Sequence, residues 1–212
     1  MPETAGGTIW LAVLAAYAIG ALPFSYWLVR WRRGADVRLV GSGNPGATNA
    51  LRVGGAPVGF VALALDVFKG WVAIEVGRRL GVSDWALGAV ALAAVAGHVF
   101  PIWLGLRGGK GVATAAGTFL ALAPVALGLG VIAFVVVVLW TRLVSLGSIT
   151  AAVTVPIASA LLALRSGLWS ERQPVIVWIA VISLLILVRH RKNLQRLLAG
   201  REARLGIKVE DS

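Results

Sequence analysis

The chain has 212 residues, a formal net charge of +11 and no cysteine. Hydrophobic residues make up 58% of it and charged residues 14%, whereas soluble domains average about 45–50% and about 25%. A soluble domain this apolar would lack the polar residues to cover its core, so the composition indicates an integral membrane protein. The lack of cysteine excludes disulfides, thiolate catalysis and cysteine metal sites.

The apolar residues fall into seven segments, which predict membrane-spanning helices. The fourth segment is too short to cross about 30 Å of hydrocarbon by itself, and Pro124 separates it from the fifth. If the fourth segment is a tilted or half-inserted helix, the chain crosses only six times. We predict an all-α polytopic membrane protein with seven transmembrane helices. The segments cover residues 8–29, 57–76, 84–104, 112–122, 124–140, 145–164 and 174–188.

The basic residues predict the orientation of these helices, because cytoplasmic loops are enriched in Lys and Arg. With the N-terminus outside, 15 of the 20 Lys and Arg residues, Lys208 among them, fall on the cytoplasmic side. Four fall outside, and Lys69 lies within a span. We therefore expect an outer N-terminus and a cytoplasmic C-terminus, and the positive charge requires no nucleic-acid partner. Residues 1–10 contain Glu3 and no Lys or Arg, so a cleavable signal peptide is not expected.

The sequence predicts one membrane domain over residues 1–188 and a basic cytoplasmic tail over 189–212. In the tail, Leu194, Leu197 and Leu198 fall on one helical face, with basic side chains around the rest. This pattern is typical of a helix that lies in the headgroup layer and favours anionic lipid.

Glycine and polar residues gather in three segments on the predicted cytoplasmic side, residues 41–49, 108–111 and 189–193. The first has the glycine spacing of a dinucleotide fingerprint, and it also resembles a phosphate-binding loop with Ala47 in place of the lysine. The fingerprint requires a βαβ unit, whereas a membrane span follows here. Nucleotide binding is therefore not expected.

The segment at residues 41–49 nevertheless suits an anion. Its glycines let backbone N–H groups approach a ligand closely, and the guanidinium of Arg52 matches the geometry of phosphate. The alternative is an interfacial turn in which the glycines serve only tight packing. The predicted binding residues here are Gly41, Ser42, Gly43, Asn44, Gly46, Thr48, Asn49 and Arg52.

The segment Gly-Gly-Lys-Gly at residues 108–111 comes directly before the fourth apolar segment. Lys110 is therefore expected near a helix N-terminus, where an anion meets both the ammonium and the helix dipole. The alternative is a lysine that only marks the cytoplasmic side. We predict substrate contacts for Gly108, Gly109 and Gly111 beside Lys110.

The two histidines, His98 and His190, lie at the predicted cytoplasmic ends of spans. His190 and Asn193 are three residues apart and share a helical face. A lone histidine in a helix usually has a structural role, but both stand beside segments that suit anions, which favours a role in the reaction. Neither has further ligands at suitable spacing, so no metal or other cofactor is predicted.

Asp66 and Lys69 lie in the middle of the second apolar segment. Each charge costs about 2.5–3.5 kcal/mol at the bilayer centre, so the two must either pair with each other or face a polar cavity. We predict a cavity that opens to the cytoplasmic side and in which Asp66 and Lys69 bind substrate. The alternative is that they form a structural ion pair.

Three stretches, residues 41–52, 97–114 and 190–193, resemble the motifs of the bacterial membrane acyl-phosphate:glycerol-3-phosphate acyltransferases, the PlsY family. Residues 65–70 and 141–148 are similar to further patterns of that family. The resemblance implies a multi-pass enzyme of the bacterial cytoplasmic (inner) membrane, with seven helices and a cytoplasmic active site. It implies acyl transfer from acyl phosphate to the 1-hydroxyl of glycerol 3-phosphate. The products would be lysophosphatidic acid and phosphate, in the first step of phospholipid synthesis.

The same resemblance implies no cofactor and no use of acyl-CoA or acyl carrier protein. Membrane lipid is expected as a partner, and no obligatory protein partner is expected. Because acyl phosphate is already activated, the enzyme needs to position its substrates and needs no nucleophile of its own. The loop at 42–49 is expected to hold one phosphate and to stabilise the charge that leaves toward it. The predicted catalytic residues are Ser42, His98, Lys110, His190 and Asn193.

Glycerol 3-phosphate is expected to be held by Arg52, Lys110, His190 and Asn193. Further binding residues on the predicted cytoplasmic side are Arg142, Ser145 and Ser148. The base that takes the hydroxyl proton stays open between His98, His190 and the acyl phosphate itself.

Two other classes of function fit parts of the sequence. A transporter of a small organic phosphate would also need basic, glycine-rich sites, but it should have related halves and broken helices that meet at mid-membrane. No convincing internal repeat is present. A non-catalytic assembly or lipid-sensing protein would tolerate neutral substitutions in the three polar segments.

Overall fold

The structure is a computed structural model that describes the backbone of residues 4–205 and the side chains of residues 6–205. Within those residues it contains ten α-helices, one 3-10 turn and no β-strand. The chain forms two compact units, Met1–Leu122 and Ala123–Ser212. Glu3 and Lys208 lie outside the described residues.

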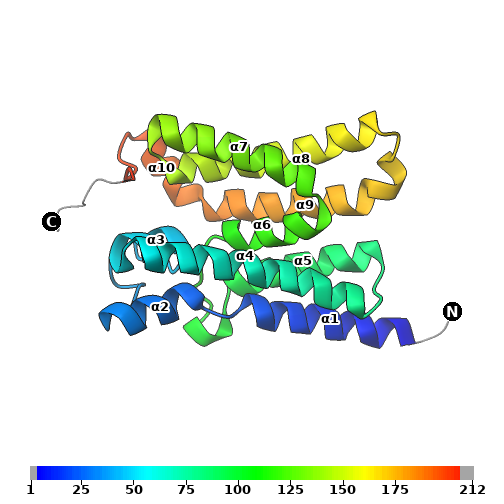
Figure 1. The fold of residues 1–212 in the computed structure, drawn as a ribbon, viewed down its shortest axis with the longest axis horizontal. Helices are drawn as coiled ribbons and strands as arrows, with labels where there is room; N and C mark the ends of the chain where they lie inside the picture. The colour runs from blue at the N-terminus through cyan, green and yellow to red at the C-terminus, as the bar shows by residue number, and fades with distance from the viewer. Residues whose placement is uncertain (1–3, 206–212) are drawn as a thin grey trace. The chain divides into compact units, whose positions relative to one another are not determined.

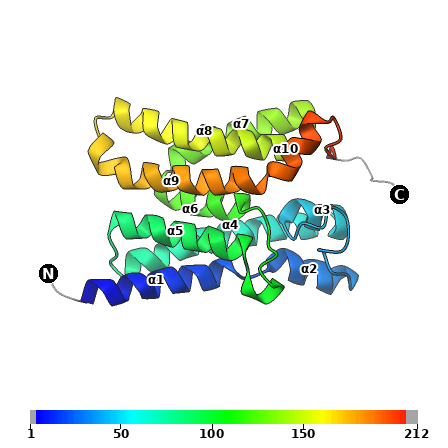
Figure 2. The ribbon, with the colours of Figure 1, turned by 180° about the vertical axis from the view of Figure 1, so that it is seen from behind.

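The first unit is built around its longest helix, α4, which packs against α1, α2, α3, α5 and α6 (Figure 1). Helices α1 and α5 also pack against each other, as the view from behind shows (Figure 2). The elements of this unit are α1 (Thr4–Gly20), α2 (Phe24–Arg33), α3 (Ala47–Gly54), α4 (Ala56–Arg79), α5 (Asp84–Val99), η1 (Ile102–Leu104) and α6 (Val112–Leu122).

Glycines allow these helices to approach closely. A Cβ on Gly97 of α5 would overlap with the carbonyl oxygen of Tyr17 in α1, and a Cβ on Gly20 would overlap with Ala94. Likewise, a Cβ on Gly117 of α6 would overlap with the backbone of α4 at Val67. Such small residues at helix crossings let backbones touch, which is a common way for helices to associate in membranes.

The part of the second unit that the structure describes contains four helices, of which α8 packs against both α7 and α9. The short helix α10 follows α9 after a single residue and contacts both α8 and α9. The leucines Leu194 and Leu198 of α10 are exposed. The bounds are α7 (Pro124–Thr141), α8 (Val144–Arg165), α9 (Trp169–Arg189) and α10 (Arg191–Leu198).

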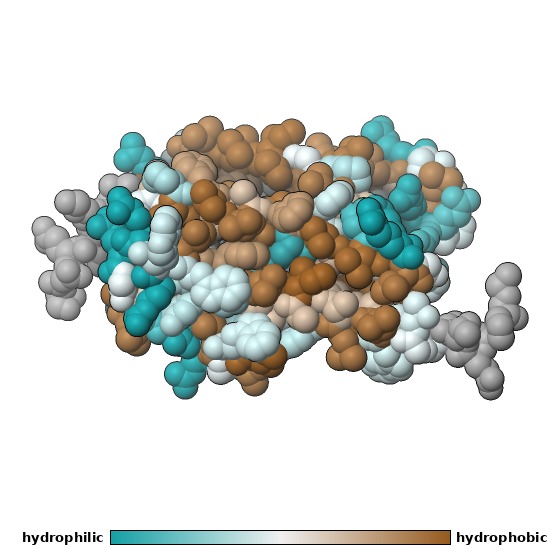
Figure 3. Space-filling view, turned by 60° about the horizontal axis from the view of Figure 1, so that its bottom comes forward, coloured by the Kyte–Doolittle hydropathy of each residue, from teal (hydrophilic) through white to brown (hydrophobic). Residues whose placement is uncertain are grey.

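Six helical stretches within the described residues are long and apolar enough to cross a membrane, and α6 is a shorter apolar helix. Large apolar side chains such as Trp10, Leu14, Leu139 and Trp140 are exposed, and hydrophobic residues cover much of the face drawn in Figure 3. A surface this apolar is matched to lipid. The prediction of an all-helical integral membrane protein is confirmed.

Two local predictions were wrong. The first apolar segment is not one helix over residues 8–29, because it breaks into α1 and α2 between Gly20 and Phe24. Pro23 explains the break, since proline has no N–H to continue the helical hydrogen bonds and disfavours a helical conformation before it. The polar segment at 41–49 is also not wholly a loop, since α3 begins at Ala47.

Candidate active site

The first polar loop of unit 1 is held in shape by the side-chain amide of Asn49. Its Oδ1 accepts a hydrogen bond from the backbone N–H of Ser42 at 2.8 Å. Its Nδ2 donates to the carbonyl oxygens of Val37 at 2.9 Å and Val40 at 3.0 Å. Asn49 is 1% exposed. It therefore fixes the loop, whereas the sequence predicted that it would bind substrate.

Gly41 is required by the same contact. Its φ is +60°, and a Cβ there would overlap with Oδ1 of Asn49, so a side chain would meet both backbone strain and a clash. The loop carries the exposed side chain of Ser42 and leads into the first turn of α3. Arg52 is exposed near the end of α3. The remaining predicted loop residues Gly43, Asn44, Gly46 and Thr48 are partly buried.

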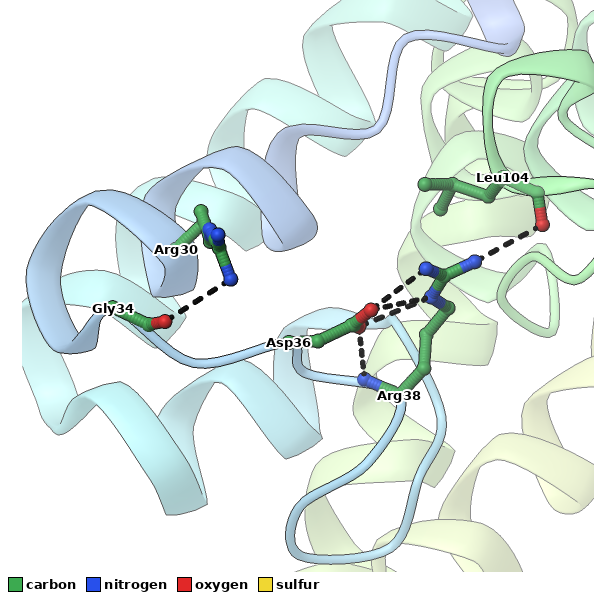
Figure 4. Close-up of polar contacts among 5 residues, drawn as sticks. All are labelled: Arg30, Gly34, Asp36, Arg38 and Leu104. Atoms are coloured by element: carbon green, nitrogen blue, oxygen red, sulfur yellow. Dashed lines mark hydrogen bonds and ion pairs between the residues drawn. The ribbon is translucent and has the colours of Figure 1, made fainter.

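Arg38 connects this loop to the next one. Its guanidinium donates to both carboxylate oxygens of Asp36, from Nη2 at 2.7 Å and from Nε at 3.0 Å, and from Nη1 to the carbonyl of Leu104 at 3.2 Å (Figure 4). The hydrogen bond from Arg38 is the main reason why the pKa of Asp36 lies below its ordinary value. Leu104 belongs to η1, so Arg38 ties the Ser42 loop to the turn that precedes Lys110.

The second loop folds back onto the end of α5. The N–H of Gly108 donates to the carbonyl of Val99, and the N–H of Gly109 donates to that of His98, both at 3.1 Å. Lys110 follows at once and is partly buried, two residues before α6. Gly111 accepts the first hydrogen bond of α6, from Ala115 at 2.8 Å. The predicted position of Lys110 near a helix N-terminus is confirmed.

Asp66, Lys69 and His98 form a buried cluster behind this loop. The Nζ of Lys69 is 2.7 Å from Oδ1 of Asp66 and 3.0 Å from Nδ1 of His98. It also donates to the carbonyl oxygen of Leu22 at 2.8 Å. The structure thus contains the ion pair between Asp66 and Lys69 that was the alternative in the sequence, and it adds His98, which the sequence did not connect with them.

In the second unit, His190 and Asn193 stand at the junction of α9 and α10. The Nδ1 of His190 is 2.8 Å from the carbonyl oxygen of Ile186. Because a carbonyl only accepts, Nδ1 carries a proton, and Nε2 is the acceptor when the ring is neutral. Asn193 donates from Nδ2 to Oε1 of Glu202 at 2.6 Å.

Glu202 is a residue that the sequence analysis missed. Its second oxygen, Oε2, accepts from Nε of Arg196 at 2.7 Å. Burial would raise the pKa of Glu202, but the hydrogen bonds from Arg196 and Asn193, with the nearby Ser145 hydroxyl, outweigh it and lower the pKa below its ordinary value. Its place between Arg201 and Arg204, an acid among arginines, was the available signal.

The other predicted residues of this unit flank the start of α8. Ser145 and Ser148 are buried, and the hydroxyl of Ser148 donates to the carbonyl of Val144 at 2.9 Å. Arg142 is exposed and has a positive φ of 59°, which is unusual for a residue with a side chain. Its carbonyl accepts from the N–H of Leu205 at 2.7 Å. Unit 2 therefore connects a set of polar residues through direct contacts and through their neighbours in the chain: Arg142, Ser145, His190, Asn193 and Glu202.

Each unit thus presents one polar cluster. Unit 1 brings together the Ser42 loop, the Lys110 loop and the buried Asp66, while unit 2 brings together His190 and Asn193 with Glu202. Within the described residues no three His, Cys, Asp or Glu side chains are grouped as metal ligands. The fold and these clusters define a helical integral membrane protein with two polar clusters, of which the one in unit 1 is glycine-rich and basic, a composition that suits anions.

The comparisons give the family. Residues 10–200 match the family described as glycerol-3-phosphate acyltransferase, and the chain belongs to it. The predicted family and enzyme class are confirmed: the chain is an acyltransferase.

Relatives named glycerol-3-phosphate acyltransferase cover nearly the whole chain. One from Thermus thermophilus is 46% identical over 205 residues, 95% of this chain and 97% of the relative. The one from Synechococcus sp. (strain CC9902) is 45% identical over 200 residues, 93% of this chain and 96% of the relative.

Two crystal structures of PlsY (YgiH), an integral membrane glycerol 3-phosphate acyltransferase, are similar to this fold. The glycerol 3-phosphate form has a TM-score of 0.84 at 37% identity and covers 93% of this chain and 96% of that one. The lysophosphatidic acid form has a TM-score of 0.82 at 35% identity, covering 93% and 95%.

Proposed function

We propose that this enzyme transfers a fatty acyl group from acyl phosphate to the 1-hydroxyl of glycerol 3-phosphate. The products are lysophosphatidic acid and inorganic phosphate, in the first step of phospholipid synthesis. The observation that carries the proposal is the similarity over 93% of the chain to structures of a substrate form and a product form of one acyltransferase. A transporter of organic phosphates has no comparable support.

The reaction joins the hydroxyl oxygen to the acyl carbonyl carbon and breaks the bond from that carbon to the phosphate oxygen. The electron pair of the broken bond leaves on phosphate. Since acyl phosphate is a mixed anhydride, no enzyme nucleophile is required, and the protein contributes by holding two anions close and in line. Binding groups that stabilise the charge developing on phosphate account for most of the acceleration.

The Ser42 loop is the proposed cradle of the acyl phosphate. Ser42 is an exposed residue, while its backbone N–H is already bound to Asn49. The N–H of Asn49 is bound to the carbonyl of Gly46, and the N–H groups of Ala47 and Thr48 before it, in the first turn of α3, suit phosphate oxygens. Asn44 and Thr48 supply further donors, and Gly41, Gly43 and Gly46 give the loop its shape.

Glycerol 3-phosphate is proposed to bind Arg52, Lys110, His190 and Asn193. Arg142, Ser145 and Ser148 are the further proposed binding residues. We assign the hydroxyl proton to the departing phosphate, with the Nε2 acceptor of His190 orienting the hydroxyl. A pH profile of kcat that loses its acidic limb in His190→Gln would instead identify His190 as the base.

The membrane arrangement proposed with this function has seven helices, with α6 as the fourth, an outer N-terminus and a cytoplasmic C-terminus. The excess of basic residues on one side supports it. Residues 1–188 form the membrane domain in the cytoplasmic (inner) membrane. Residues 189–212 form the tail, and the exposed leucines of α10 support its contact with lipid headgroups. The acyl chain lies among helices open to lipid.

The deciding experiment uses the purified protein in lipid with acyl phosphate and labelled glycerol 3-phosphate. Labelled lysophosphatidic acid and one equivalent of inorganic phosphate are the expected products. Equal rates with acyl-CoA would disprove acyl phosphate as the specific donor. Uptake of labelled glycerol 3-phosphate into sealed vesicles without any product would favour the transporter.

A further inference from the structure

Three ionisable side chains meet inside the first unit at the depth of a membrane span. Asp66 is 1% exposed, Lys69 3% and His98 8%. Charges at such positions are costly unless they are paired. Lys69 and Asp66 form an ion pair at 2.7 Å. The other contacts of Lys69 indicate the role of the three residues.

An ammonium has three donors and no acceptor, and Lys69 is within 3.0 Å of Nδ1 of His98. Oδ1 of Asp66 lies 3.6 Å from the same nitrogen, further away than Nζ of Lys69. With Lys69 as the donor, Nδ1 accepts, and the proton of a neutral imidazole is on Nε2. One carboxylate, one ammonium and one neutral imidazole have no net charge, which suits this buried position. Lys69 and Asp66 thus fix which ring nitrogen of His98 is a donor.

The Nε2 edge of His98 faces the second polar loop. A Cβ on Gly109 would overlap with Nε2 and stand 3.0 Å from the neighbouring ring carbons. The backbone of the same loop is bound to the end of α5, through the N–H of Gly109 and the carbonyl of His98. His98 therefore meets the loop by both its ring and its backbone, one residue before Lys110.

The space around the cluster is too small for substrate. Asp66, Lys69, His98 and Gly109 line a cavity of about 10 Å³, and a single water molecule needs about 10–15 Å³. A glycerol 3-phosphate molecule does not fit there. An effect of the cluster on the reaction must pass through the loop.

We infer that Asp66, Lys69 and His98 are positioning residues, which hold the Gly108–Gly111 loop so that the Lys110 ammonium meets the phosphate of glycerol 3-phosphate. The inference rests on the proposed function and assigns these three residues a role other than substrate contact. Lys69 also binds the carbonyl of Leu22, so the cluster ties the loop to the break between α1 and α2.

The test compares His98→Ala, His98→Gln and Gly109→Ala in steady-state kinetics with both substrates varied. His98→Ala should raise the KM for glycerol 3-phosphate about tenfold and change the KM for acyl phosphate less than about twofold. His98→Gln restores an N–H near the position of Nε2 and should recover most of the loss. Gly109→Ala leaves all three charges in place and should reproduce the KM effect, even if His98→Ala fails to fold.

A double variant separates positioning from other roles. In a Lys110→Ala background, His98→Ala should raise the KM for glycerol 3-phosphate less than about twofold further, because the loop no longer has an ammonium to place. Glu75→Gln is the matched control, since Glu75 pairs with Arg78 on the same helix at the same spacing but near the surface. It should leave both KM values unchanged.

Three results would overturn the inference. One is a fall in kcat for His98→Ala with both KM values unmoved, which would indicate a base. Another is full additivity with Lys110→Ala. The third is a lower unfolding temperature with normal kinetics in both His98→Gln and Gly109→Ala. A wild-type enzyme that forms no lysophosphatidic acid would instead refute the proposed function.

Discussion

The side-chain amide of Asn193 donates a 2.6 Å hydrogen bond to the carboxylate of Glu202, nine residues further along the chain. The same carboxylate accepts from Arg196. One acid therefore orients Asn193, a proposed contact of glycerol 3-phosphate, from the tail that follows α10. The bond also shows that the Nδ2 side of the Asn193 amide faces Glu202.

Glu202→Gln should reduce activity about tenfold or more, because it replaces two charge-assisted hydrogen bonds, each worth about 1.5–3 kcal/mol. The measurement is kcat/KM for glycerol 3-phosphate together with the unfolding temperature in detergent. Glu171→Gln, at an exposed acid in the first turn of α9, should behave as the wild type. Equal effects of the two substitutions would contradict this role of Glu202.

The stability of unit 2 should also depend on the ionisation of Glu202. Because its hydrogen bonds lower its pKa in the folded state, its stabilising contribution is complete above about pH 4.3, the ordinary pKa of glutamate. The contribution is lost as the pH falls through the lower folded pKa. The unfolding temperature of the wild type should therefore drop more steeply below about pH 4.3 than that of Glu202→Gln.

Ser42→Ala should lower kcat at least about a hundredfold, the size of effect seen when one donor to a developing anion is removed. The fold should survive, since the contact that shapes the loop uses the backbone N–H of Ser42 and not its hydroxyl. Activity and unfolding temperature are measured on the same preparation. Ser166→Ala, at an exposed hydroxyl after α8, is the control, and a near-normal rate in Ser42→Ala would mean that this loop does not bind the reacting phosphate.

Gly41→Ala should destabilise the protein more than Gly34→Ala. Both glycines have a positive φ, +60° and +67°, so both substitutions carry the same backbone strain of about 1–2 kcal/mol. Only Gly41 would place its Cβ against Asn49, whereas Gly34 has nothing within 4 Å. The difference in unfolding temperature isolates the clash, and Gly41→Ala alone should also lose activity. Identical losses would show that Asn49 does not fix the loop.

Arg38→Lys should lower activity several-fold while keeping the charge. A lysine cannot donate in parallel to both oxygens of Asp36 and also reach the carbonyl of Leu104, as the guanidinium does. The KM of each substrate is measured, and both should rise by about two- to fivefold, because Arg38 joins the two loops. Arg30→Lys, at an exposed arginine that donates to the carbonyl of Gly34 (Figure 4) and keeps its charge when it is replaced by lysine, should leave both values unchanged.

The sequence predicted those parts of the fold that depend on local composition. The fourth apolar segment was expected at residues 112–122, and α6 has the same bounds, because glycine before it and Pro124 after it limit the helix from both sides. The break at Pro23 was missed since hydropathy stays high across it. Helix α3 was missed because its polar residues resemble those of a loop.

The sequence predicted which types of residue make up the candidate site, but it predicted few of the contacts between them. Ser42 and Lys110 lie in polar segments of an otherwise apolar chain. Few structural roles would require polar side chains at those positions, so a role in binding was expected. Asn49 shares that surrounding but is turned inward, and no spacing rule separates an amide that holds a loop from one that binds a ligand. Glu202 and Arg38 act on partners that only the folded chain brings near.

The interrupted first span has one more consequence. A helix that stops within a membrane leaves a carbonyl without its usual partner, which is costly in hydrocarbon. A lysine at the same depth is costly for the opposite reason. The hydrogen bond from the ammonium of Lys69 to the carbonyl of Leu22 gives each of these two groups a partner. A substitution that removes one of them therefore leaves the other without that partner. A change that made α1 and α2 continuous would leave the ammonium of Lys69 without this acceptor, and the loss of the lysine would leave the carbonyl of Leu22 without this donor inside unit 1.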